Sequence, residues 1–243
     1  MQIEMLDFVA GARAARGVAV IIDVFRAFSV ACYAAAQGAA RIIPLGAAEE
    51  ALQLKRADPR VFTVGERHGR KLDGFDCGNS PTELADFDLR GRTLVHTTHA
   101  GTQGLVNALA ADVVLTGSLV NAAAICRYIA TLAPATVSLV RMGVAATTRS
   151  EADDVCAELL AARLSGQSFD AGSIVPRLRR SPEAHKFFDP AADWAPKGDF
   201  ELCAALDRFD FVLRLAEGAE GAEGAEGRRC LNQIPMSAAS IGG

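Results

Sequence analysis

The sequence has no cysteine pair with C-x-x-C spacing, although six cysteines are spread along it, at positions 32, 77, 126, 156, 203 and 230. Without such a pair it predicts neither a structural zinc site nor a thioredoxin-type dithiol, so we expect reduced thiols. No apolar run reaches the ~18 residues of a membrane-spanning helix. The first residues, M-Q-I-E-M-L-D-F, carry acids where a signal peptide has a basic segment. These absences predict a soluble, cytoplasmic protein with no membrane partner.

Positive charge of the kind that nucleic acids attract is also lacking. The formal net charge is −4, and there is no RNP, zinc-finger or helix-turn-helix signature, so we expect no nucleic-acid partner. The G-x-x-x-x-G-K-[ST] and strand-linked G-x-G-x-x-G motifs are missing, which leaves nucleotide and NAD binding without their usual signatures. No G-x-S-x-G nucleophile elbow occurs either.

Short β-branched apolar runs alternate with helix-forming segments along most of the chain. Residues 18–24, V-A-V-I-I-D-V, are typical of a strand buried on both faces. The alanine-rich segment that follows ends at Gly38, a typical helix stop. Further strands are predicted near 41 and over 61–64, 93–98, 112–116 and 136–142, and helices over 47–56, 101–110, 119–132 and from Ser150, a favourable N-cap. This alternation predicts a three-layer α/β/α sandwich with a mostly parallel or mixed sheet.

The alternation of strands and helices fades after about residue 166. Short helical segments are predicted over 172–188 and 199–207, and F-D-F-V-L-R-L at 209–215 is a candidate last strand. Residues 218–227 are an exact Gly-Ala-Glu repeat, which we interpret as a mobile acidic surface loop because it cannot pack a core. With 243 residues, half of them apolar, the chain has room for one large α/β domain, and we treat residues 1–243 as that domain.

The polar chemistry is concentrated in one stretch, residues 64–83, which reads V-G-E-R-H-G-R-K-L-D-G-F-D-C-G-N-S-P-T-E. Carboxylates are hard oxygen ligands for Mg²⁺, and guanidinium groups bind phosphate or carboxylate oxygens bidentately. Glycines let backbone amides approach a ligand closely. The alternative is a solvated polar loop, but Phe75 and the helix start at 79–81 argue against disorder. We therefore interpret this stretch as part of a site that holds an anion beside a metal.

Other polar clusters follow the ends of predicted strands. In open parallel sheets, ligands bind in the crevice beyond the carboxyl ends of the strands. The clusters in such positions are Asp23 with Arg26, residues 97–102, Ser118 with Asn121, and residues 141–154. A carboxylate at the end of a buried strand, as at Asp23, is costly unless it is paired or bound to a metal. A plain ion pair with Arg26 is the alternative to a catalytic role.

Three further motifs leave alternatives open. The T-T-H-A-G-T turn at 97–102 could bind phosphate at a helix start, or its threonines could act only as caps. The acids of E-A-D-D at 151–154 are favoured by the helix dipole alone, although Asp153 and Asp154 would also suit Mg²⁺. Ser80 precedes a proline and suits a cap or an anion contact better than a nucleophile.

The two histidines of the H-x-x-H motif, His96 and His99, lie at a predicted strand end. They would face opposite sides there, because successive strand side chains alternate between the two faces. A structural role is therefore favoured over a two-histidine metal site.

Four motifs together resemble the 2-phosphosulfolactate phosphatase family: D-V-F-R-A at 23–27, G-E-R-H-G-R-K-L-D-G-F-D-C-G-N-S-P at 65–81, the T-T-H-A-G-T turn and the D-D pair. The likeness runs from about residue 18 to D-F-E-L-C at 199–203. It implies a Mg²⁺-dependent phosphatase, usually a homodimer, that hydrolyses the phosphate ester of 2-phospho-3-sulfolactate in coenzyme M biosynthesis. The family usually has Thr-Thr-Asn-Gly-Thr in the turn, where this chain has Ala100 preceded by His99, and often a threonine where Phe28 stands.

The resemblance also implies roles for individual residues. The expected catalytic residues are Asp23, Arg26, Glu66, Arg67, Asp76, Asn79 and Ser80. The expected substrate-binding residues are Thr98, His99, Gly101 and Thr102, with Arg141 or Lys71 as the cation for the substrate's acid group. Mg²⁺ would be held by some of Glu66, Asp23, Asp153 and Asp154. The alternatives are a phosphatase for another small phospho-acid and a non-catalytic anion-binding homologue.

Overall fold

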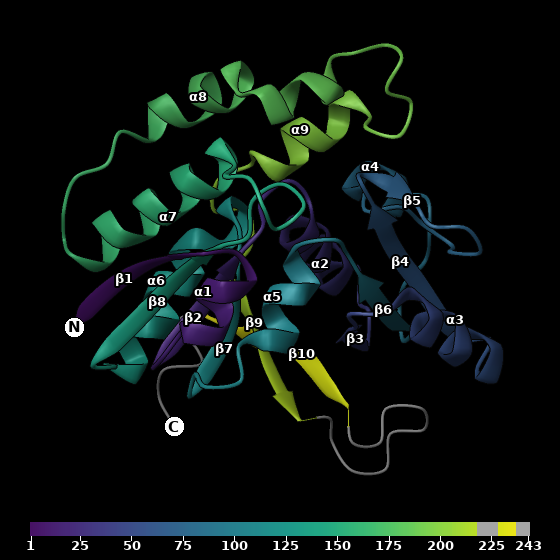
Figure 1. Ribbon diagram of the computed structural model, residues 1–243, viewed down its shortest axis with the longest axis horizontal. Coiled ribbons are helices and arrows are strands. Elements are labelled where there is room, and N and C mark those ends of the chain that lie inside the picture. The colour runs from purple at the N-terminus through teal and green to yellow at the C-terminus, as the bar shows by residue number, and fades with distance from the viewer. Residues whose placement is uncertain (218–227, 237–243) are drawn as a thin grey trace.

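The computed structural model describes residues 1–217 and 228–236 (Figure 1). The Gly-Ala-Glu repeat at 218–227 lies outside the described residues. One sheet contains ten strands in the order β1-β8-β2-β7-β9-β10-β3-β6-β4-β5. They are β1 (Gln2–Asp7), β2 (Val18–Ile22), β3 (Arg41–Pro44), β4 (Val61–Arg67), β5 (Arg70–Lys71), β6 (Thr93–Thr97), β7 (Val113–Gly117), β8 (Thr136–Arg141), β9 (Phe211–Glu217) and β10 (Arg229–Pro235).

Helices cover the sheet and one of its ends. The α-helices are α1 (Phe8–Ala14), α2 (Ala27–Ala36), α3 (Ala48–Ala57), α4 (Pro81–Leu84), α5 (Gly101–Asn107), α6 (Ala122–Leu132), α7 (Glu151–Leu164), α8 (Ile174–Arg180) and α9 (Lys197–Cys203). The 3-10 helices are η1 (Leu119–Asn121), η2 (Ala171–Ser173) and η3 (Pro182–Phe187). No helix in the described part of the chain is both long and apolar enough to cross a membrane.

The six strands expected from the apolar runs are all present, as β2, β3, β4, β6, β7 and β8. They form two parallel sets, β8-β2-β7 and β3-β6-β4, and the predicted last strand is β9, which begins two residues later than expected. Successive residues of β2 face opposite cores: Ile21 packs with α1, α2 and α5, whereas Ile22 packs with α6 and α7. The three-layer α/β/α prediction is therefore confirmed.

No local pattern in the sequence predicted β1, β5, β10 or α1. β1 lies at the sheet edge, pairs with β8 alone among the described residues and is partly exposed along its length, so it needs no continuous apolar run. β10 contains polar residues and is recognisable only through its partners, because it pairs along its whole length with β9 and at Leu231 with β3. β1 therefore owes its conformation to a neighbour that is distant in sequence, and β10 owes its conformation to the pairing with β9.

The β9–β10 hairpin separates the two parallel sets and is antiparallel to both of its neighbours. By hydrogen bonding alone, β2 and β6 would therefore run in opposite directions. Five strand-to-strand steps separate them, and a twist of about 20–25° at each step accumulates to roughly 100° or more. Because of this twist, the carboxyl ends of both parallel sets can face one region.

The C-terminal helices α8 and α9, with η3 between them, lie above the sheet on the side of α7 (Figure 1). They are held by aromatic packing, in which Phe200 lies against Phe187 and Phe188. Phe25, from the turn after β2, joins the same cluster. This packing fixes η3 over the turn that carries Asp23.

His96 on β6 gives the fold a defined sensitivity to acid. Its ring is fully buried, with Nε2 3.2 Å from Asn79 Oδ1, and burial lowers its pKa from 6.5 to about 4. The unfolded chain therefore binds more protons between these values, so the free energy of unfolding should fall by up to about 3 kcal/mol from pH 6.5 to pH 4. In His96→Gln, urea denaturation should show a shallower fall. His185→Gln, at an exposed site, should keep the wild-type slope, and equal slopes in all three proteins would contradict the assignment.

Candidate active site

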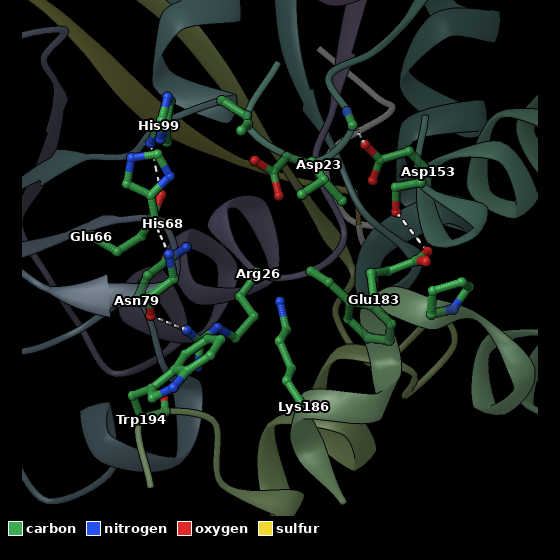
Figure 2. Close-up of a pocket in the computed structure, with 18 residues that line it drawn as sticks. Asp23, Arg26, Glu66, His68, Asn79, His99, Asp153, Glu183, Lys186 and Trp194 are labelled. Atoms are coloured by element: carbon green, nitrogen blue, oxygen red, sulfur yellow. Dashed lines mark hydrogen bonds between the residues drawn. The ribbon is translucent and has the colours of Figure 1, made fainter. Parts of the chain in front are cut away.

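A cavity of about 300 Å³ lies where the turns after β2, β6 and β8 meet the end of β4 beneath η3. Four carboxylates line it, from Asp23, Glu66, Asp153 and Glu183, and Glu183 accepts hydrogen bonds from the Ser150 hydroxyl and the Ala152 amide at the start of α7. Figure 2 shows Glu66, His68 and His99 on one side, Asp153 and Glu183 on the other, and Lys186 pointing from below toward Asp23. The predicted clusters after β2, β4, β6 and β8 are thus brought together. The predicted cluster of Ser118 and Asn121 after β7 is not part of the cavity lining, because Ser118 is hydrogen-bonded to Ser29 and Asn121 donates to the Phe211 carbonyl.

Backbone amides orient the Asp23 and Asp153 carboxylates. Asp23 directly follows β2, and its Oδ1 accepts a hydrogen bond from the Ala27 amide at 3.2 Å. Asp153, in the first turn of α7, accepts from the Val24 amide at 2.9 Å and from the Gly143 amide at 2.7 Å. Asp153 therefore joins the turn after β2 to the turn after β8, which fixes the spacing of the two acids.

Glu66 joins the other half of the site. Its Oε1 accepts a hydrogen bond from the His99 amide at 2.7 Å, and its Oε2 accepts from the Gly69 amide at 2.7 Å. The first bond ties the end of β4 to the turn after β6, and the second closes the β4–β5 hairpin. His68 and His99 pack edge to face on this wall, with ring centroids 4.5 Å apart.

The site concentrates negative charge. Burial, followed by the charge of Glu66, raises the pKa of Asp23 to about 6. Burial and the neighbouring Asp23 raise the pKa of Asp153 well above its usual value. Carboxylates that repel one another in a desolvated cavity favour a bound cation or a bound proton.

Lys186 supplies positive charge from the opposite wall, and the sequence analysis missed it. It lies on η3, with Nζ 5.0 Å from the centroid of the Phe187 ring and 5.8 Å from that of Trp194. Burial, followed by the charge of Arg26, lowers its pKa to about 8. Its sequence surroundings, E-A-H-K-F-F, give no signal of a site, because only the packing of η3 directs the side chain into the cavity.

Arg26 does not pair with Asp23, so the alternative of an ion pair between these two residues is wrong. Arg26 forms an ion pair, but with a different acid. Its Nη1 donates to Asp199 Oδ2 at 2.6 Å and to the Trp194 carbonyl at 3.1 Å, and its Nη2 donates to the Gly69 carbonyl at 2.9 Å. Both members of the Arg26–Asp199 pair are buried. Although Arg26 lines the cavity, its terminal nitrogens hold segments of the protein together.

Ser80 and Asp76 have structural partners. The Ser80 hydroxyl donates to Asp199 Oδ1 at 2.7 Å and accepts from the Glu83 amide at 3.1 Å, so Ser80 caps α4. Asp76 accepts from Lys55 Nζ at 2.7 Å and from the Thr63 amide at 2.8 Å. Neither residue lines the cavity, whereas Asn79 does.

Arg67, Arg141 and Asp154 also lie outside the cavity lining. Arg67 donates to the carbonyls of Glu66 and Gly46 and to Thr97 Oγ1. Arg141 pairs with Asp7 and, at 3.3 Å, with Asp154, which Arg149 also contacts at 2.8 Å. Asp154 therefore has two cations as partners and points away from the cavity that Asp153 lines. Lys71 pairs with Glu83 at 3.4 Å.

The T-T-H-A-G-T turn closes on itself. The Thr98 amide donates to Thr102 Oγ1 at 2.9 Å, and the Thr102 amide donates to Thr98 Oγ1 at 3.1 Å, so each hydroxyl accepts a backbone hydrogen bond within the turn. His99 and Ala100 line the cavity. A Cβ on Gly101 would lie 2.8 Å from Asp23 Oδ2, so glycine is required for the close approach of this turn to the acid.

The donor chemistry of the cavity fits a hard divalent cation better than a zinc ion. In the described residues, no three His, Cys, Asp or Glu side chains form a ready-made metal cluster. Mg²⁺ commonly keeps several waters and uses only one or two carboxylates together with substrate phosphate, so it does not require such a cluster. Asp23, Glu66 and Asp153 could hold it, whereas Asp154 does not fit because arginines occupy it.

Comparison with known proteins assigns the family. The family model for 2-phosphosulpholactate phosphatase matches residues 7–218. A probable 2-phosphosulfolactate phosphatase from Bacillus subtilis is 30% identical over 199 residues, which are 82% of this chain and 86% of that protein. Proteins of the same name from Caldanaerobacter subterraneus and Symbiobacterium thermophilum are 41% and 43% identical over 112 and 117 residues. The first match covers 45% of this chain and 46% of the relative, and the second covers 47% of this chain and 50% of the relative. The chain thus matches about half the length of these two relatives. The chain therefore belongs to the 2-phosphosulpholactate phosphatase family.

Proposed function

We propose that this protein is a Mg²⁺-dependent phosphatase that hydrolyses the phosphate ester of a small 2-hydroxy acid, converting 2-phospho-3-sulfolactate to 3-sulfolactate and phosphate. One observation carries the proposal: the carboxylates of Asp23, Glu66 and Asp153 lie with Lys186 around one cavity of about 300 Å³. That volume lies at the lower end of the range for small-molecule sites, which suits a compact phospho-acid. Family membership supports the same substrate class.

Asp23, Glu66 and Asp153 are the residues that would hold the metal ion. Bound there, Mg²⁺ would supply Lewis-acid polarisation of the phosphoryl oxygens and lower the cost of their developing charge. The amide hydrogen bonds to Glu66 and Asp153 restrict the rotation of both carboxylates. The protein would therefore bind the ion with little reorganisation.

Hydrolysis forms a bond from a water oxygen to phosphorus and breaks the ester P–O bond, so one proton must leave the water and the departing alkoxide must gain one. Of Asp23 and Asp153, the carboxylate with an oxygen not taken by the ion would accept the proton from water. The imidazoles of His68 and His99 stand on the wall beside Glu66 and are suited to donate to the leaving oxygen.

The deciding experiment measures phosphate release from a panel of phospho-2-hydroxy acids, with phosphosulfolactate and phospholactate included, in Mg²⁺ and in EDTA. We expect turnover with a preference for the sulfonate, a loss of about 100-fold or more in EDTA, and recovery when Mg²⁺ is restored. Turnover with a preference for another phospho-acid would redirect the substrate assignment. Saturable binding without turnover would favour a non-catalytic anion-binding homologue. The observation that supports this alternative is that Thr98 and Thr102 of the turn are hydrogen-bonded to each other.

A homodimer, a cytoplasmic location and a place in coenzyme M biosynthesis remain predictions from the family resemblance.

A further inference from the structure

The cations near the cavity differ in how many of their hydrogen-bond donors remain free. The terminal nitrogens of Arg26 are used by Asp199, the Trp194 carbonyl and the Gly69 carbonyl. Those of Arg67 are used by two carbonyls and Thr97. A guanidinium has five N–H donors, so three of the five are engaged in each arginine and two remain. Both arginines are tied to the protein through most of their donors, and Arg67 lies outside the cavity lining.

Lys186 differs from both arginines. Within the described part of the chain, its ammonium makes no ion pair or hydrogen bond. Its amine makes cation–π contacts with the rings of Phe187 and Trp194. An ammonium carries three donors, and aromatic faces satisfy none of them as an anion would. Figure 2 shows the side chain extended into the cavity with its amine directed toward Asp23.

The position of this amine relates it to the carboxylates as well. Lys186 lines the same cavity as Asp23 and Glu66, with its amine directed toward the Asp23 side chain (Figure 2). Lys186 therefore lies within electrostatic reach of the carboxylate cluster but is not bonded to it. A group that fits between carboxylates holding a cation and a free ammonium carries several negative oxygens, and a phosphoryl group is of this kind.

We propose that Lys186 is a catalytic residue that binds the phosphoryl group being transferred. The inference rests on the proposed function for the identity of the ester. It assigns the phosphoryl group to the space between Lys186 and the Asp23–Glu66 side of the cavity. The remaining acid group of the substrate then lies elsewhere in the cavity.

The test uses Lys186→Met, which keeps the length and apolar packing of the side chain against the two rings. With Mg²⁺ present, kcat/KM should fall by about 100-fold or more, as when one donor to a developing anion is removed. The inhibition constant of inorganic phosphate should rise by about 10-fold or more, the value of one charge-assisted hydrogen bond. The inhibition constant of the dephosphorylated hydroxy acid, which has no phosphoryl group, should stay at the wild-type value.

Lys197→Met, at the exposed start of α9 and outside the cavity lining, is the matched control and should behave as wild type. If inorganic phosphate inhibits Lys186→Met as strongly as wild type, the inference is overturned. It is also overturned if the substitution weakens inhibition by the hydroxy acid but not by phosphate, because Lys186 would then bind the acid group of the substrate. If the wild-type protein releases no phosphate, the proposed function fails. Calorimetric binding of inorganic phosphate to both proteins then decides the role of Lys186, and no difference between them, or no binding by either, overturns it.

Discussion

The Asp23→Asn variant is expected to lose phosphatase activity by about 1000-fold or more, because it removes a charged oxygen ligand and a proton acceptor together. Asparagine keeps the acceptor for the Ala27 amide, so the turn after β2 should be preserved. Removing a charge that repels Glu66 and Asp153 should leave the melting temperature unchanged or higher. The measurement is phosphate release with saturating Mg²⁺, with thermal unfolding alongside.

A matched substitution separates the structural assignment from the sequence motif. Asp154→Asn alters the neighbouring member of the acidic pair, which contacts Arg141 and Arg149. Its activity should stay within a few-fold of wild type, since exposed or partly exposed ion pairs contribute little. Equal losses in Asp23→Asn and Asp154→Asn would contradict the placement of the metal and restore the pair as its ligand. Full activity in Asp23→Asn would remove Asp23 from the mechanism.

The second large effect is expected on stability. Asp199→Ala should lower the free energy of unfolding by about 3–5 kcal/mol, the cost of leaving a buried charge without its partner. The substitution removes the carboxylate that accepts hydrogen bonds from the Arg26 guanidinium, the Ser80 hydroxyl and the Thr82 amide. Urea denaturation at neutral pH measures the loss.

The double variant Arg26→Met, Asp199→Leu tests whether the two residues act as a pair. Its loss should be smaller than the sum of the two single losses, because no unpaired charge remains buried. Asp88→Ala breaks an exposed pair with Arg90 and should cause no measurable change. Additive losses, or a stable Asp199→Ala, would show that Arg26 is not held by this contact and would leave its guanidinium available for phosphate.

The strands of the two parallel sets could be predicted because each of them carries a local signal. A strand buried on both faces is mostly apolar along its length, as V-A-V-I-I is in β2. Its burial can therefore be predicted from consecutive residues of the sequence. The glycine-rich stretch around Glu66 was recognisable for a similar reason. A strand end that carries acids and glycines can be neither core nor helix, and Gly101 stands where no Cβ fits against Asp23.

Other parts had no such signal. β1 depends on a partner that is far away in sequence, and β10 (R-C-L-N-Q-I-P) has no apolar run of its own, so the hairpin that divides the sheet gave no local signal. The sequence also does not show which residues of the motifs line the cavity and which have structural partners. Arg26 and Ser80 meet at Asp199, more than 100 residues farther along the chain, and this contact makes them structural.

The sequence by itself determined the α/β class, the family, and the carboxylates of Asp23, Glu66 and Asp153 as candidates, because these depend on residue type and local spacing. Only the tertiary structure separated Asp153 from Asp154 and brought Lys186 into the cavity. On a helix, neighbouring residues point in directions about 100° apart, so one acid reaches the cavity and the next reaches an arginine. The direction of Lys186 is set by the packing of Phe187 and Phe200 around η3, a contact between segments that no local pattern encodes.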